Sequence, residues 1–124
     1  MKILVVDDEE DVKSLFEQKF RKEIRSGQFE FSFAFSGEEA LRFMENDTSG
    51  VVMILSDINM PGMSGIELLK AIRKDHPAAP PKIMMITAYG DRDNHDQAID
   101  LGADDFLSKP VDFNELKVKL LNTL

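Results

Sequence analysis

The stretch VVMILS, residues 51–56, consists of five apolar residues followed by one serine. A short segment that is apolar almost throughout is typical of a central strand in a parallel sheet whose two faces are both covered. ILVV at 3–6 and KIMMI at 82–86 have largely the same character. We therefore predict three buried parallel strands at the centre of one sheet.

Two further segments predict strands that are less buried. FEFSFAF at 29–35 alternates strictly between phenylalanine and smaller or polar residues, which indicates a strand with one well-buried face. ADDFLS at 103–108 is shorter and more polar. We expect these two strands at the edges of the sheet, so that the strand order is 2-1-3-4-5.

Helical patterns separate the five predicted strands. Val12, Leu15, Phe16 and Phe20 recur at helical spacing. Capping patterns open later helices, with serine or aspartate followed three residues on by glutamate, at Ser36–Glu39, Ser64–Glu67 and Asp112–Glu115. Residues 91–101 form a weak helical pattern with few apolar positions. The result is (βα)5, an α/β, doubly wound parallel sheet of the flavodoxin-like type in one domain, residues 1–124.

The composition excludes several classes of function. The chain has a net charge of −8, which argues against a nucleic-acid or membrane surface. It has no cysteine, so disulfides, thiolate zinc sites and a cysteine nucleophile are excluded. No apolar run has the length of a signal peptide core or a membrane span, and we expect a cytoplasmic protein.

Polar and charged residues stand where the predicted strands end. They are Asp7 and Asp8 after the first strand, Asp57 after the third, Thr87 after the fourth, and Lys109 with Pro110 after the fifth. The carboxyl ends of parallel strands share one edge of the sheet, where ligands bind near the switch point, so we expect these residues to converge. Carboxylates about 4 Å apart repel by ~4 kcal/mol at a surface-like dielectric, unless a cation lies between them. Oxygen ligands without histidine or cysteine suit Mg²⁺ or a similar ion.

The other acids in this stretch have a simpler interpretation. Glu9, Glu10 and Asp11 directly precede the first helical pattern. Negative charge at a helix N-terminus is stabilising by a few tenths to ~1 kcal/mol per residue. We therefore assign these three acids to the start of the helix rather than to a cation.

The whole chain resembles the receiver domain of two-component response regulators, which are CheY-like proteins. The matching residues are Asp7-Asp8 after ILVV, Asp57 in LSDINMPGMSG, Thr87 in ITAYG, and Lys109-Pro110 in GADDFLSKP. The resemblance implies that Asp57 accepts a phosphoryl group from a sensor histidine kinase, a histidine phosphotransfer protein or a small phosphodonor. It implies a phosphoacceptor switch rather than an enzyme with turnover.

The resemblance also implies roles for the surrounding residues. Mg²⁺ (or Mn²⁺) would be held by Asp8, Asp57 and the main-chain carbonyl of Asn59, with Asp7 acting through water. Lys109 and Thr87 would contact phosphoryl oxygens, and Ala88 would leave room for the group. Lys109–Pro110 resembles the family's cis peptide. Asn59 and Tyr89 occupy positions that tune the lifetime of the phosphoryl group.

The output implied by the resemblance is a change of surface. Thr87 would move toward the phosphoryl group, and Phe106 on the fifth strand would turn inward. Phe106 lacks the hydroxyl that a tyrosine would present to a partner. The sparse apolar face of residues 91–101 predicts a loosely held helix. This helix, the fifth strand and the last helix (the α4-β5-α5 surface in the family's labels) would then control a downstream protein or a fused output domain. A dimer formed on phosphorylation is left open.

Three other functions compete with this one. A flavodoxin-like cofactor binder requires a phosphate cradle after the first strand, where DDEED at 7–11 would repel phosphate. A haloacid dehalogenase-type phosphatase requires a D-x-D pattern there, and this chain has adjacent aspartates. A degenerate receiver that only binds proteins stays open as the main alternative. The two histidines, His76 and His95, are interpreted as solvated.

Overall fold

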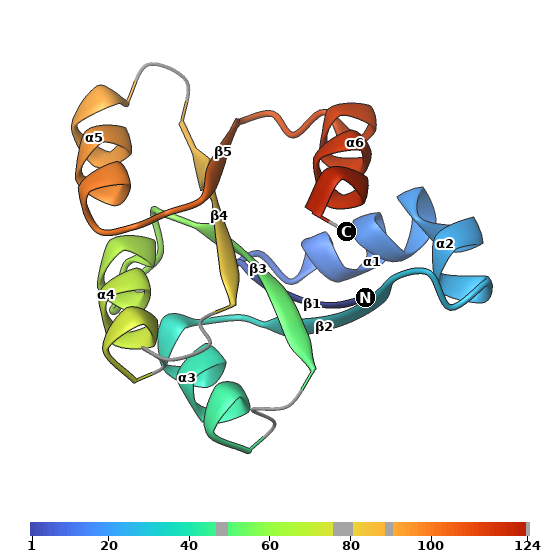
Figure 1. The fold of residues 1–124 in the computed structure, drawn as a ribbon, viewed down its shortest axis with the longest axis horizontal. Helices are drawn as coiled ribbons and strands as arrows, with labels where there is room; N and C mark the ends of the chain where they lie inside the picture. The colour runs from blue at the N-terminus through green and yellow to red at the C-terminus, as the bar shows by residue number, and fades with distance from the viewer. Residues whose placement is uncertain (47–49, 76–80, 89–90, 124) are drawn as a thin grey trace.

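The computed structural model describes residues 1–46, 50–75, 81–88 and 91–123. Within these residues five strands alternate with helices (Figure 1), and only the first strand is followed by two helices. The elements in chain order are β1 Lys2–Val6, α1 Asp11–Lys19, α2 Arg21–Arg25, β2 Glu30–Ala34, α3 Gly37–Asn46, β3 Val51–Asp57, α4 Gly65–Asp75, β4 Lys82–Thr87, α5 Arg92–Asp100, β5 Asp105–Ser108 and α6 Phe113–Thr123.

The strands form one parallel sheet in the order β2-β1-β3-β4-β5. This confirms the predicted order, with β2 and β5 at the edges. Helices α3, α4 and α5 lie on one side of the sheet, and α1 and α6 lie on the other (Figure 1). The sheet is therefore doubly wound, as the apolar central strands predicted.

Side chains of the central strands alternate between two apolar clusters. Ile3 and Val5 of β1 join the cluster under α1 and α6, which includes Phe16 and Leu116. Leu4 and Val6 join the cluster under α3, α4 and α5. This period of two explains why an uninterrupted apolar run fits a strand that is buried on both faces.

The three predicted capping residues begin three helices. Ser36 Oγ accepts a hydrogen bond from the main-chain N–H of Glu39 at 3.0 Å, and Ser64 Oγ accepts one from Glu67 at 3.2 Å. The Asp112 carboxylate accepts hydrogen bonds from the main-chain N–H groups of Asn114 and Glu115. Each interaction satisfies N–H groups that a helix leaves unpaired at its start.

The prediction of one helix through Phe20 is wrong. Phe20 has φ −111° and ψ 27°, so α1 ends there and α2 begins at the next residue. The ring of Phe20 is 1% exposed and lies 5.7–5.9 Å from the rings of Phe16, Phe29 and Phe113. Packing of this aromatic cluster explains a break that neither glycine nor proline marks in the sequence.

The edge strands also differ from the predictions. β5 begins at Asp105 rather than at residue 103, because the main-chain N–H of Ala103 bonds to Ala98 and still belongs to the turn after α5. In β2, Ala34 is fully buried in the cluster opposite the phenylalanines, so both faces of this strand contribute to the core. His76 and Leu124 lie outside the described residues. No helix in the described ranges is long and apolar enough to span a membrane.

Candidate functional site

Three carboxylates meet at the carboxyl edge of the sheet. Asp7 follows β1, Asp8 is next to it, and Asp57 is the last residue of β3. Strands β1 and β3 are paired as far as Val6 and Ser56, so Asp7 and Asp57 stand one residue further along adjacent strands. Each of the three aspartates offers one oxygen, and these oxygens lie within 4.8 Å of one another. The sheet brings together the three acids that the sequence singled out.

Lys109 completes the cluster from the other side. Its Nζ donates a hydrogen bond to Asp57 Oδ2 at 2.7 Å, across 52 residues of sequence. The other carboxylate oxygen of Asp57, Oδ1, accepts a weak hydrogen bond from the main-chain N–H of Asn59 at 3.3 Å. Asp57 itself is only 2% exposed. A buried carboxylate is therefore held in one orientation by an ammonium and by its own following loop.

The site carries more negative charge than its lysine can balance. The pKa of Asp7 is raised, first by burial and also by the charges of Asp57 and Asp8, although the N–H of Glu9 and the charge of Lys109 oppose this shift. Burial alone would lower the pKa of Lys109, but its hydrogen bond to Asp57 and the charges of Asp57 and Asp7 outweigh burial and raise it. The shift of the Asp7 pKa thus reflects burial first and neighbouring anions second, whereas the raised pKa of Lys109 reflects its anionic neighbours.

The donor set fits a hard divalent cation. All the side-chain donors are carboxylate oxygens, and Asp8 is exposed, so water can reach the cluster. Mg²⁺ and Mn²⁺ prefer oxygen ligands, and Mg²⁺ keeps several waters. Asn59, whose main-chain carbonyl the resemblance predicts as a further ligand, is also exposed and lies two residues after Asp57. The residues present therefore fit the cation predicted from the sequence.

Thr87 and Ala88 line a different hollow. Thr87 is 5% exposed, and its hydroxyl donates to the main-chain carbonyl of Leu107 at 3.4 Å. The two residues line a cavity of about 500 Å³ with the N-cap of α5, three residues of α5 and one of β5, namely Asp91, Arg92, His95, Asp96 and Ser108. The carbonyl of Thr87 accepts a 2.8 Å hydrogen bond from the N–H of Lys109. The hydroxyl expected to share the acidic cleft is thus turned toward β5 in this structure.

Phe106 has a partner that the sequence analysis missed. The ring of His95 in α5 lies 4.0 Å from that of Phe106, with the two planes inclined at 37°. The side chain of His95 is 41% exposed, so its interpretation as a solvated residue holds in part, but one face of the ring packs against Phe106. His95 stands three residues before the buried Ala98, and this helical spacing places the imidazole on the face of α5 that turns toward the sheet.

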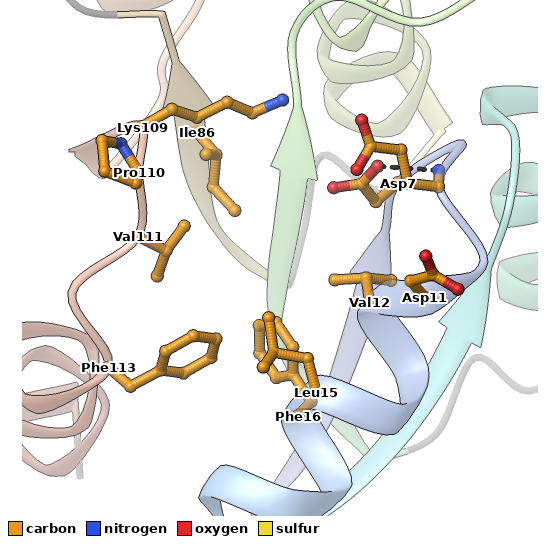
Figure 2. Close-up of a pocket in the computed structure, with 11 residues that line it drawn as sticks. Asp7, Asp11, Val12, Leu15, Phe16, Ile86, Lys109, Pro110, Val111 and Phe113 are labelled. Atoms are coloured by element: carbon orange, nitrogen blue, oxygen red, sulfur yellow. Dashed lines mark hydrogen bonds between the residues drawn. The ribbon is translucent and has the colours of Figure 1, made fainter.

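An apolar cleft of about 540 Å³ adjoins the acidic cluster. Figure 2 shows Val12, Leu15 and Phe16 of α1 on one side, with Val111 and Phe113 on the other. Lys109 extends over the cleft toward Asp7 (Figure 2). Leu15 is 41% exposed, so apolar surface is open to solvent directly beside the charged site.

The remaining predicted site residues are Pro110 and Tyr89. The Lys109–Pro110 peptide bond is cis. Pro110 lines the apolar cleft next to Lys109. Tyr89 lies outside the described residues.

Asp7→Asn is expected to stabilise the metal-free protein at pH 7. A raised pKa means that the folded state holds the Asp7 proton more tightly than the unfolded chain does, so ionisation lowers the free energy of unfolding above the folded-state pKa. The penalty disappears as the pH falls below 3.8, the ordinary pKa of an aspartate in an unfolded chain. Asparagine keeps an oxygen for the N–H of Glu9, which now bonds to Asp7 Oδ1 at 2.9 Å.

The measurement is a melting temperature by circular dichroism in a chelator, from pH 4 to pH 8. A gain of ~1 kcal/mol corresponds to about 4 °C for a domain of this size. The gain should shrink toward pH 4. Asp8→Asn, in the exposed neighbour, should raise the melting temperature less. An Asp7→Asn variant that melts below wild type at pH 7 would contradict the electrostatic account.

Comparison with protein families gives one match over nearly the whole chain. The model described as the response regulator receiver domain matches residues 3–121. Among solved structures, a response regulator receiver domain protein from Clostridium thermocellum has a TM-score of 0.85 at 30% identity, covering 98% of this chain and 92% of that one. The chemotaxis protein CheY4 of Vibrio cholerae has a TM-score of 0.82 at 28% identity, covering 99% of this chain and 98% of its own.

Curated relatives are longer than this chain. Response regulator RppA of Synechocystis sp. is 32% identical over 120 residues, which are 97% of this chain and 49% of RppA. Transcriptional regulatory protein CpxR of Escherichia coli K12 is 34% identical over 119 residues, which are 96% of this chain and 47% of CpxR. The chain thus spans about half the length of these two relatives.

Proposed function

We propose a function from one premise: this chain belongs to the response regulator receiver domain family. Its role is to accept a phosphoryl group on Asp57 in two-component signalling and to change its surface in response. The observation that carries the proposal is the environment of Asp57, which is buried, bonded to Lys109 at 2.7 Å and grouped with Asp7 and Asp8. Such domains are phosphoacceptor switches rather than enzymes that turn over a substrate.

In the proposed reaction an oxygen of Asp57 attacks phosphorus in a phosphohistidine. A phosphorus–oxygen bond forms, the phosphorus–nitrogen bond breaks, and the imidazole leaves with the bonding electrons, which take up a proton. A bound Mg²⁺ or Mn²⁺ would neutralise phosphoryl charge. Asp8, Asp57 and the carbonyl of Asn59 would hold the ion, with Asp7 reaching it through water. Since donor and acceptor are both anionic, positioning and charge neutralisation provide most of the catalysis.

Three other groups have proposed contacts with the phosphoryl oxygens. Lys109 exchanges its hydrogen bond to Asp57 for one to the phosphoryl group, and it stays protonated because its pKa is raised. Thr87 turns its hydroxyl from the Leu107 carbonyl to a phosphoryl oxygen. This movement breaks only a long hydrogen bond, the 3.4 Å contact with Leu107. The small side chain of Ala88 leaves space for the group. Asn59 and Tyr89 tune how long the acyl phosphate survives.

The proposed output is carried by α5, β5 and α6, the surface that the family's labels call α4-β5-α5. When Thr87 moves, Phe106 turns inward and leaves its contact with His95. Helix α5 buries only Ala98, so it is held weakly enough to shift. The cavity of about 500 Å³ that Thr87 lines together with α5 gives this helix room to move.

Hydrogen exchange with and without phosphorylation tests this switch. We expect protection within residues 88–106 to change by about tenfold, while the amides of β1 and β3 keep their protection because they lie in the centre of the sheet. Equal protection of residues 88–106 with and without phosphorylation would contradict the proposed switch.

The proposed partners follow from this chemistry. The donor is a sensor histidine kinase or a histidine phosphotransfer protein, and the apolar cleft beside Lys109 offers it a surface next to Asp57. The recipient of the signal is a downstream protein or a fused output domain, which the greater length of the relatives allows. We propose a cytoplasmic location, no direct contact with nucleic acid, and a phosphorylation-dependent dimer as one form of the output.

The test is the intact mass after incubation with acetyl phosphate, with and without Mg²⁺. One added phosphoryl group that requires Mg²⁺ supports the proposal. If no mass is added, beryllofluoride is the second probe, and Mg²⁺-dependent shifts in the amide spectrum at Asp57 and Thr87 would still support it. Failure of both probes would leave the degenerate, protein-binding receiver as the function of this chain.

A further inference from the structure

The loop that follows β3 is hydrogen-bonded to α3, a helix that lies earlier in the chain. Residues 58–64 connect β3 to α4 and carry Asn59. The main-chain N–H of Met63 in this loop donates a 3.0 Å hydrogen bond to Oε1 of Glu38, 25 residues earlier in the sequence. Glu38 is in the first turn of α3. The contact therefore ties the loop to a helix that also packs against α4, β2 and β1.

Packing at both ends of this contact is close. A Cβ on Gly37 would lie 2.9 Å from Cγ and Sδ of Met63, so the methionine side chain sits directly on the start of α3. A Cβ on Gly62, which has φ +71°, would lie 3.3 Å from Oε1 of Glu38. Glycines thus allow both the backbone conformation of the loop and its approach to α3.

Hydrogen bonds also fix the two ends of the loop. The N–H of Asn59 donates to Asp57 Oδ1 at 3.3 Å, and the N–H of Gly65 donates to the carbonyl of Ile58 at 2.8 Å. The Glu38 contact lies between them, so it restrains the middle of a loop whose ends are already closed. A shift of the middle of the loop would therefore move Asn59 and the Asp57 oxygen that is bonded to it.

Glu38 is prepared to act as a charged acceptor. Its pKa is lowered, first by a hydrogen bond from its own main-chain N–H and then by the N–H of Met63, with smaller contributions from Ser36 and Arg42. A carboxylate at a helix N-terminus is also favoured by the helix dipole. Hydrogen bonds to an ionised acceptor are stronger than those to a neutral one.

We propose that Glu38 is a positioning residue for the phosphoacceptor site. By holding the N–H of Met63, it keeps the 58–64 loop in the conformation that presents the Asn59 carbonyl and orients Asp57 for the cation. Glu38 touches neither the phosphoryl group nor the ion. The inference rests on the proposed function, because it assigns a role within that site.

The test compares Glu38→Ala, Glu38→Gln and a matched control, Glu39→Ala. The control removes an equal charge from the same helical turn, and it leaves the bond to Met63 intact. Three quantities are measured for each protein: amide exchange at Met63 without metal, the Mg²⁺ dissociation constant by calorimetry, and the rate of phosphorylation by acetyl phosphate. Melting temperatures report any general loss of structure.

In Glu38→Ala we expect amide exchange at Met63 to be about tenfold faster. Mg²⁺ binding should be roughly threefold to tenfold weaker, at or below the lower end of the effect of outer-shell partners in metal sites. Phosphorylation at low Mg²⁺ should slow by the same factor and recover at saturating Mg²⁺. Glu38→Gln, which keeps an acceptor, should lie between Glu38→Ala and wild type, and Glu39→Ala should match wild type.

Two results would overturn the inference, and they differ in what they say of the function. A Glu38→Ala protein that binds Mg²⁺ within about a factor of two of a working wild type removes the role of Glu38 and leaves the function standing. A wild type that neither binds Mg²⁺ nor takes up phosphate removes both, and that failure is visible before any variant is made. Equal losses in Glu38→Ala and Glu39→Ala would also overturn it, because charge rather than the bond to Met63 would then be responsible.

Discussion

Asp57→Asn is expected to abolish the mass gain from acetyl phosphate. The amide of asparagine lacks the carboxylate oxygen that attacks phosphorus in the proposed reaction, and no other described aspartate combines 2% exposure with a 2.7 Å hydrogen bond to a lysine. Asparagine has nearly the same shape and keeps an oxygen for Lys109, so the fold should survive. The loss should therefore be chemical, with at least a hundredfold fall in the rate, as for loss of a nucleophile or of a key electrostatic group.

The control is Asp100→Asn, on the exposed side of α5. This variant loses the same charge at a distance from the acidic cluster and should gain one phosphoryl group as wild type does. Circular dichroism of each variant checks that the fold is retained. If Asp57→Asn still gains one phosphoryl group at the wild-type rate, another side chain is the acceptor and the assignment of Asp57 is wrong.

The fold was predictable because its signals are local. Uninterrupted apolar runs such as 51–56 identified the central strands, and Ser36 and Ser64 marked helix starts that the structure confirms with hydrogen bonds. Strand order followed from the relative polarity of the strands. The break at Phe20 was missed because its cause is the packing of aromatic rings from α1, β2 and α6, which no local pattern records.

The site was predictable only for residues that stand directly at strand ends. Asp7 and Asp57 converge because adjacent parallel strands end together. The roles of Glu38 and His95 were not predicted, because each contacts its partner through a side chain that reaches another element. Their partners, the N–H of Met63 and the ring of Phe106, are fixed by how α3 and α5 pack against the sheet. Sequence spacing within one element does not reveal such pairs.

Gly65 is a further residue that spacing did not reveal. It is the first residue of α4, where most side chains would be accepted by a helix. In the fold, however, a Cβ at this position would lie 2.3 Å from the carbonyl oxygen of Asp57 and 2.8 Å from Cα of Ile58. Both atoms belong to the backbone, one in the last residue of β3 and one in the residue that follows it. Gly65 therefore permits α4 to begin directly against the site.

Gly65→Ala is expected to destabilise the protein by about 3 kcal/mol, at the upper end for overpacking, although alanine favours helix by ~1 kcal/mol. The steric effect should win, because the obstructing atoms are main-chain atoms that move only with β3. Urea unfolding followed by circular dichroism measures the change.

The matched control is Gly27→Ala. A Cβ at Gly27 would meet no atom within 4 Å, but φ is +79°, so backbone strain alone should destabilise this variant by ~1 kcal/mol. Phosphorylation should slow in Gly65→Ala and not in Gly27→Ala, since only the former displaces Asp57. If Gly65→Ala proves no less stable than Gly27→Ala, helix α4 can retreat from the strand, and the close approach of α4 is not what fixes the position of Asp57.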